Sequence, residues 1–243
     1  SQRVTLKSLS VESPSLRLKA VGHSDLLDDR GAAIARGALP RALVTQLDFS
    51  EVTVDPEGVF ASPVRFSDGV LDLKLQFRPF RLQVGQLVLT EGKERLSLTG
   101  RAEIAEDGWK GGLDVALNAI EAQRLMRLWP VSAVPGTRKW LSENVGQAEF
   151  TNFKAALRFA EKTPPRFALG YEFSGAEVRF IRTLPPIQEG HGRATIEGNV
   201  YTVVVDGGHV TAPQGGRIEV GGSVMTVPDI TKFPATAEVR LIT

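Results

Sequence analysis

Strict alternation of apolar and polar residues is the feature that most constrains this sequence. Residues 71–78 read Leu-Asp-Leu-Lys-Leu-Gln-Phe-Arg and alternate at every position. Successive side chains of a β-strand point to opposite faces of the sheet, so this pattern predicts a strand with one apolar and one polar face. Alternation recurs in eight further segments: 16–19, 96–99, 113–115, 167–173, 176–180, 201–205, 218–220 and 237–241.

Short clusters rich in Gly, Pro and Asp separate these segments, and they indicate how the strands are connected. Such clusters occur at 55–58, 106–108, 163–165, 206–208 and 212–216. Connections of this length join antiparallel neighbours, whereas parallel strands need a crossover helix. The sequence therefore predicts a mainly β fold built on an elongated antiparallel sheet, either one unit or two fused halves, and it excludes a doubly wound α/β fold.

One interval has helical rather than strand periodicity. Apolar residues between Asn118 and Trp129 recur at helical spacing, with Asn118 placed to cap the helix and Glu121 completing a capping box. Pro130 then ends this predicted helix. A second helix is predicted from about 137 to 144, with Gly146 in the left-handed conformation after its end.

These features divide the chain into three predicted regions. Residues 1–117 form an N-terminal β region, residues 118–146 a helical seam, and residues 147–243 a C-terminal β region. The segment 22–43 is the hardest to assign, because Gly31, Gly37 and Pro40 interrupt it. We interpret it as a strand pair.

Composition excludes some functions. The 29 basic and 28 acidic residues leave a net charge of +1, which provides no surplus to neutralise a nucleic acid backbone. There are no cysteines, so disulfides and thiolate metal sites are ruled out. No apolar run approaches the roughly 20 residues of a membrane-spanning helix. The sequence starts without a signal-like segment and stops inside a predicted strand, so we expect a fragment whose membrane contact lies outside it.

No catalytic or metal-binding motif emerges. His23, His191 and His209 form no HExxH pattern, and only His191 and His209 lie in turns that could bring them together. The acidic cluster Asp25, Asp28 and Asp29 lacks EF-hand spacing. Carboxylates such as Asp72 and Asp114 occupy polar strand positions, which are typical of an exposed face. We therefore expect a protein that is not an enzyme, with no cofactor and no metal.

The three tryptophans are candidates for a ligand-binding site. Trp109, Trp129 and Trp140 could stack on sugar rings, as aromatic faces do. Two of them fall in the predicted helices, where packing of helix onto sheet is the simpler role. We therefore expect Trp129 and Trp140 to be core residues.

The helical seam resembles a known family. The sequences Leu-Trp-Pro at 128–130 and Arg-Lys-Trp-Leu at 138–141, followed by Gly146 and by Leu-Pro-Pro at 184–186, are similar to the central domain of YhdP-type proteins in the AsmA-like superfamily. The resemblance covers about the last two thirds of the chain, from about Leu71. It carries over as a structural signature only: Trp129, Pro130, Arg138, Trp140, Leu141 and Gly146.

The resemblance implies a long, curved, groove-like antiparallel sheet in the bacterial periplasm, tethered to the inner membrane. Its apolar concave face is expected to carry phospholipid acyl chains toward the outer membrane. Together with the one-sided alternation, this predicts a lipid groove lined by Leu71, Leu73, Leu75, Leu96, Leu98, Leu113, Val115 and Leu117.

Two other functions stay open at this point. A closed sandwich whose interior is filled by its own side chains would be a scaffold that binds other envelope proteins instead. An envelope enzyme would need convergent carboxylates or histidines in a pocket.

Overall fold

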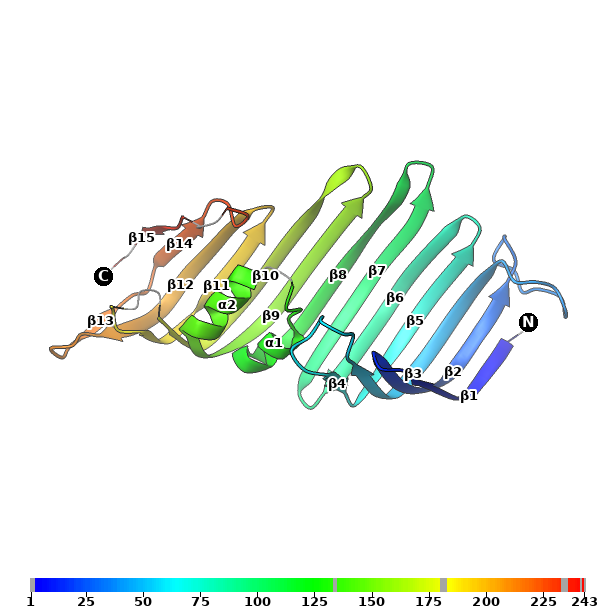
Figure 1. The fold of residues 1–243 in the computed structure, drawn as a ribbon, viewed down its shortest axis with the longest axis horizontal. Helices are drawn as coiled ribbons and strands as arrows, with labels where there is room; N and C mark the ends of the chain where they lie inside the picture. The colour runs from blue at the N-terminus through cyan, green and yellow to red at the C-terminus, as the bar shows by residue number, and fades with distance from the viewer. Residues whose placement is uncertain (1–2, 133–134, 180–182, 233–235, 241, 243) are drawn as a thin grey trace. The chain divides into compact units, whose positions relative to one another are not determined.

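A computed structural model describes residues 3–132, 135–179, 183–232, 236–240 and 242 of the 243-residue chain. It is mainly β: a single open antiparallel sheet of many strands, accompanied by two short helices (Figure 1). The strand order is β1-β2-β3-β5-β6-β7-β8-β9-β10-β11-β12-β14-β15, with β4 paired to β3 and β13 to β12. The predicted antiparallel sheet with a helical pair near the middle is thus confirmed. Residues 180 and 241, at the ends of two predicted strands, lie outside the described residues.

The chain divides into two compact units. Unit 1 comprises Ser1–Glu57, Ser62–Ala116 and Ala156–Arg166, and unit 2 comprises Gly58–Ala61, Leu117–Ala155 and Phe167–Thr243. The division passes through three strands of the sheet: β8 (Gly108–Glu121), β9 (Val145–Ala160) and β10 (Thr163–Val178).

Unit 1 is a meander of antiparallel strands. In addition to its parts of β8, β9 and β10, it contains β1 (Arg3–Glu12), β2 (Leu16–Leu27), β3 (Ala42–Val54), β4 (Val64–Phe66), β5 (Asp68–Phe77), β6 (Phe80–Glu91) and β7 (Glu94–Ala105). The last residues of β3 pair with β4, whereas its first eight pair with β5. Buried apolar side chains are few and include Val52, Val64, Phe66 and Leu89.

The segment 22–43 is only partly a strand pair. Its two ends belong to β2 and β3 and are paired, for example Leu26 opposite Leu43. Residues 28–41 between them form a loop, so the prediction of strand structure there is wrong. Gly31 and Gly37 have φ angles of 80° and 85°, which an extended strand does not allow.

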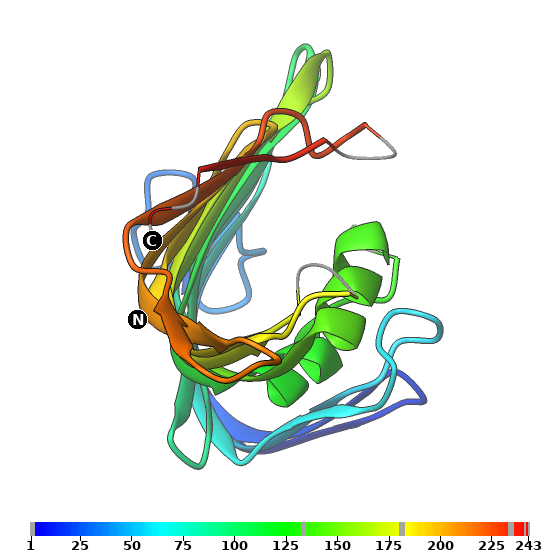
Figure 2. The same ribbon diagram turned by 90° about the vertical axis from the view of Figure 1, so that its left-hand side faces the viewer.

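Unit 2 combines strands with both helices. It contains α1 (Ala122–Leu128), α2 (Pro135–Asn144), β11 (Ile187–Glu197), β12 (Val200–Thr211), β13 (Arg217–Glu219), β14 (Ser223–Val227) and β15 (Glu238–Arg240). Both helices lie on one face of the unit 2 strands (Figure 2). One buried cluster in this unit consists of Ala194, Val203, Val205 and Val220, against which Tyr171, Phe173, Ile187, Tyr201, Val210 and Met225 pack.

The first helix begins later than its sequence predicts. Residues 118–121 continue β8, and Glu121 precedes α1 without any side-chain cap hydrogen bond. A capping interaction contributes only about 1 kcal/mol. Leu117 and Ile120 of the same strand are 5% and 1% exposed, and their burial outweighs the capping signal at Asn118.

The second helix ends where predicted but without a glycine cap. Gly146 is the second residue of β9 and is not among the residues with positive φ, so its predicted left-handed conformation is wrong. The side chain of Asn144 instead donates from Nδ2 to the carbonyl oxygen of Trp140 at 2.8 Å. This bond satisfies a carbonyl of the last turn, and β9 follows the helix directly.

Candidate functional site: an aliphatic face in unit 1

The strand register of unit 1 brings most of the predicted groove residues together on one face. Residues opposite each other in neighbouring strands share a face of the sheet. Four rows cross β3, β5, β6 and β7: Leu43, Leu75, Leu82 and Ala102; Thr45, Leu73, Val84 and Gly100; Leu47, Leu71, Leu87 and Leu98; and Phe49, Gly69, Leu89 and Leu96. We call this set of rows the aliphatic face.

The aliphatic face continues onto β8. A Cβ atom placed on Gly100 would lie 3.2 Å from a methyl group of Leu113, so Leu113 projects on the same side of the sheet. Val115 follows two positions later and shares that side by alternation. Leu117 belongs to unit 2 and is buried at 5% exposure, so it is not an accessible lining residue.

Sequence reasoning missed the contribution of β6 because a bulge hides it. Strand β6 contributes the even-numbered residues Leu82 and Val84 to the aliphatic face, but then the odd-numbered residues Leu87 and Leu89. The register shifts between Asp72 and Leu73 of the neighbouring strand, which leaves Gly85 as an extra residue. An isolated glycine within an alternating segment is the signal that could have revealed this bulge.

The opposite face of these strands is largely polar. One row crosses Val44, Lys74, Gln83 and Arg101. Ion pairs extend along this face, including Arg81 with Glu103 at 2.9 Å and Arg158 with Asp114 at 2.7 Å. None of the residues in the four rows of the aliphatic face is ionisable. The sheet of unit 1 therefore sorts charge to one side and hydrocarbon to the other.

Most of the aliphatic face is only half covered, although Leu89 is buried at 8% exposure. Leu71, Leu73, Leu75, Leu96, Leu98, Leu113 and Val115 are all of intermediate exposure. Leucines facing the interior of a two-layer sandwich interdigitate with a second sheet and lose almost all their exposure. The surface left accessible here is apolar and carries no side-chain hydrogen-bond donor other than Thr45, so it can hold a hydrocarbon without selecting a head group.

The corresponding region of unit 2 has different chemistry. Phe150 and Phe153 are three residues apart, which on a regular strand would place them on opposite faces. Both nevertheless contact the ring of Tyr171, at centroid distances of 5.3 and 6.1 Å. Asn152, with a φ of 51°, provides the irregularity that turns both rings to one side.

Tyr171 also pairs with Tyr201 through their hydroxyl groups. The two oxygens are 2.7 Å apart, and the residues lie on strands separated by β11. Burial raises the pKa of Tyr171 well above its ordinary value, and the neighbouring Tyr201 adds to the effect. Burial also raises the pKa of Tyr201. Both phenols therefore stay neutral and act as a hydrogen-bonded pair within an aromatic cluster.

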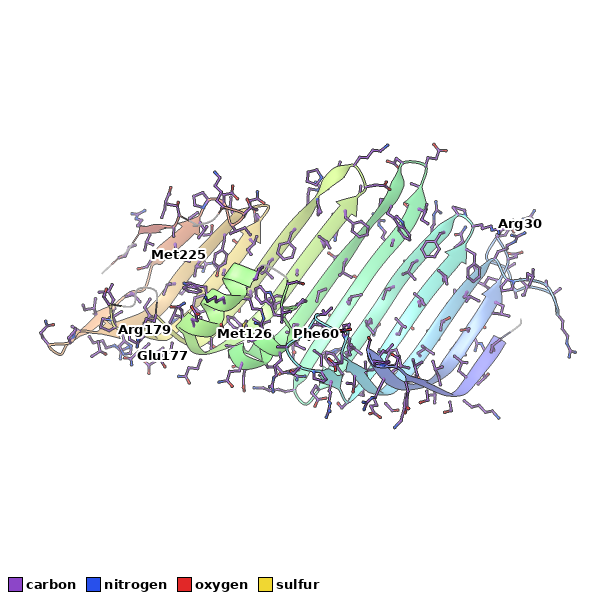
Figure 3. The ribbon with its side chains drawn as sticks, in the orientation of Figure 1. Arg30, Phe60, Met126, Glu177, Arg179 and Met225 are labelled. Atoms are coloured by element: carbon purple, nitrogen blue, oxygen red, sulfur yellow. The ribbon has the colours of Figure 1, made fainter. Side chains whose placement is uncertain are left out.

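The residues of the family signature lie around the helices of unit 2. Arg138 donates from Nη2 to the carbonyl oxygen of Met126 at 3.1 Å and so joins α2 to α1. The labelled Met126 and Phe60 mark α1 and the short segment 58–61 in Figure 3. Trp129 and Leu141 are half-buried. Trp140 is 36% exposed, contrary to its expected core role.

The histidine and aspartate candidates do not form a metal site. His191 lies opposite Gly207 and His209 opposite Gln188, on neighbouring strands. His209 borders a polar pocket with Gln147, Glu177, Gln188 and Glu189, and its Nδ1 is 3.5 Å from Glu189 Oε2. Asp25 binds Arg3, whereas Asp28 accepts backbone hydrogen bonds within its own loop. Among the described residues, no three potential ligands converge.

Comparisons with known proteins find no relative. No protein family profile, no curated protein and no solved structure matches this chain. Within the described part of the chain, neither helix has the length and apolar character required to span a membrane.

Proposed function

We propose that this chain is a lipid-binding segment whose aliphatic face in unit 1 holds acyl chains. The observation that supports the proposal most directly is the half-exposed set of leucine rows on one side of the sheet. Contiguous exposed apolar surface is unfavourable in water, and its presence points to a ligand or partner that covers it.

The chemistry of this face favours an acyl chain over other ligands. Sugars and peptides require hydrogen-bond partners, and Thr45 is the only side-chain donor in the four rows. A methylene group transferred from water to such a surface gains about 0.8 kcal/mol. A long acyl chain therefore obtains useful affinity without any directional contact, which suits a surface along which lipids slide.

We also propose the cellular setting that the YhdP-like signature implies. In this setting the chain is part of an AsmA-like protein in the periplasm, tethered to the bacterial inner membrane by a segment outside this sequence. It would contribute to phospholipid transport between the membranes and to outer-membrane integrity. The sequence resemblance at 128–146 supports this setting, and the aliphatic face is compatible with it.

A crosslinking experiment in bacteria tests lipid binding at this face. A photoreactive phenylalanine analogue replaces Leu73, in the middle of the aliphatic face, or Lys74, its neighbour on the polar face. We expect lipid adducts by mass spectrometry for position 73 and not for position 74. Equal labelling at both positions, or none at 73, would contradict the proposal.

A scaffold is the second candidate, and unit 2 supports it. The aromatic cluster around Tyr171 and the buried aliphatic residues of β11 and β12 fill that part of the molecule with its own side chains. If neither unit binds lipid, a module that holds partner proteins becomes the better description.

A further inference from the structure

Strands β1 and β2 continue the aliphatic face beyond the four rows described above. Residues of β2 lie opposite the β3 members of those rows, and residues of β1 lie opposite the β2 residues in turn. Because directly opposed residues share a face of the sheet, these side chains point to the same side as the leucines of β5 and β6. The added residues are Leu26, Ser24, Gly22 and Ala20 of β2, and Val4, Leu6 and Leu9 of β1.

Two hydroxyl groups interrupt this hydrocarbon surface. Ser24 and Thr45 lie directly opposite each other on β2 and β3, and their side-chain oxygens are 2.8 Å apart. Every other residue of the extended rows is Gly, Ala, Val, Leu or Phe. Both hydroxyl-bearing side chains are of intermediate exposure, so the protein does not enclose them. We call Ser24 and Thr45 the hydroxyl pair.

The hydroxyl pair has one proton more than its own hydrogen bond uses. Each hydroxyl group carries one O–H donor and two acceptor lone pairs. The bond between Ser24 and Thr45 uses one of the two protons. Among the residues that the structure describes, neither hydroxyl group has a second hydrogen-bond partner. The remaining proton is therefore free to bond with an acceptor outside the protein.

The chemistry of a lipid decides whether this proton finds an acceptor. A lipid that lies on the leucine rows displaces water from them, and a hydroxyl group that loses its water partner without a replacement is destabilised. An alkyl chain offers no acceptor, whereas an acyl chain ends in a carbonyl oxygen. None of the residues in the extended rows is ionisable, so a neutral ester suits this surface better than a carboxylate, whose charge would be uncompensated.

We propose that the hydroxyl pair donates a hydrogen bond to the carbonyl oxygen of an acyl ester whose chain lies on the aliphatic face. The inference rests on the lipid binding proposed above and names its ligand class more closely. Thr45 lies opposite Leu73 of β5, and Ser24 lies opposite Val4 of β1. The carbonyl thus has apolar side chains on both sides, and this hydrogen bond sets the position of the acyl chain without contacting the head group.

Two lipids that differ only at the carbonyl test the proposal. Palmitoyl lysophosphatidylcholine contains an acyl ester, and its hexadecyl analogue contains an ether in the same place. In calorimetric titrations we expect the protein to bind the ester more tightly by about three- to tenfold, which corresponds to one net hydrogen bond. A hydroxyl pair that only holds β2 and β3 together would give no such preference. Equal affinities for the two lipids would overturn the proposal.

Hydroxyl variants show whether the pair causes the preference. In Ser24→Ala or Thr45→Val the remaining hydroxyl group keeps its proton, so each single variant should still prefer the ester. The double variant has no donor and should bind both lipids equally, and its retained binding of the ether shows that it is folded. Thr53→Val is the control, because Thr53 lies beside Arg17 on the opposite face of β3. A preference that persists in the double variant, or is lost in Thr53→Val, would contradict the assignment.

Leu73→Asp separates this inference from the proposed function on which it rests. A carboxylate in the middle of the aliphatic face should abolish binding of both lipids. If the unmodified protein binds both lipids equally and Leu73→Asp binds neither, lipid binding holds and the role of the hydroxyl pair fails. If the unmodified protein binds neither lipid, the proposed function itself fails, and this inference fails with it.

Discussion

Units 1 and 2 are built from the same alternating strands, yet they cover their apolar faces differently. Unit 1 presents rows of leucine and valine that, apart from the buried Leu89, stay half-exposed. Unit 2 buries Ala194, Val203, Val205 and Val220 beneath a set of larger side chains that includes Tyr171 and Phe173. Alternation therefore creates an apolar face, whereas the side chains that pack against this face decide whether it is core or binding surface.

The largest expected difference between the units is in the effect of removing a side chain. Phe150 is 7% exposed and packs against Tyr171, so Phe150→Ala should lower the free energy of unfolding by about 3–5 kcal/mol. Leu73→Ala, on the half-exposed face, should lower it by only about 1–2 kcal/mol. Urea denaturation measures both. Equal losses would mean that the leucine face is packed as tightly as the core of unit 2.

Glycine substitutions test the same contrast by adding a methyl group. At Gly192 a Cβ atom would overlap the carbonyl oxygen of Val204 and approach the ring of Phe173 at 3.0 Å. Gly192→Ala should therefore destabilise the protein by about 1–3 kcal/mol. At Gly85 in unit 1 the nearest atom would be 3.8 Å away, so Gly85→Ala is the tolerated control. Thermal unfolding of the two variants compares them.

The hydrogen bond between Tyr171 and Tyr201 should contribute to the stability of unit 2. Tyr201→Phe leaves the hydroxyl of Tyr171 without its partner and should cost about 1–2 kcal/mol. The double variant Tyr171→Phe with Tyr201→Phe should cost less than the sum of the single changes, because it leaves no unpaired hydroxyl. Additive losses in a double-mutant cycle would argue against a coupled pair.

The same pair predicts a pH dependence. Burial raises the pKa of both phenols in the folded protein. Above a pH of about 10 the unfolded chain loses these protons while the folded chain keeps them, so stability falls as pH rises. Urea midpoints measured from pH 8 to above pH 10 should decline, and the double phenylalanine variant should decline less steeply. Parallel curves for the two proteins would contradict the assignment.

The smallest effect is expected on the polar faces. Arg193 and Asp206 form an exposed ion pair at 3.0 Å in unit 2. Exposed pairs contribute little because water and salt screen them, so Arg193→Ala should change stability by less than about 1 kcal/mol. A larger loss in chemical denaturation would show that the outer face of unit 2 is structurally more important than its exposure indicates.

Much of the candidate site follows from the sequence. Leu71, Leu73 and Leu75 were expected on one face, and their register with Leu87, Val84 and Leu82 places them there. The contribution of β6 to the aliphatic face could not be predicted from the sequence, because Gly85 shifts the alternation of apolar and polar residues by one position in the middle of the strand. The pairing of Phe150 and Phe153 on one side was equally hidden by Asn152. A bulge reverses every later position, and its location depends on the partner strand.

The amino-acid sequence by itself determined that this protein is an antiparallel sheet with one apolar and one polar face. Side-chain alternation and turn residues act locally, over a few positions, and need no knowledge of distant partners. The tertiary structure decided where α1 begins, where the bulges lie and which parts of the apolar face stay accessible. These properties depend on contacts between residues far apart in the chain, which outweigh capping signals of about 1 kcal/mol.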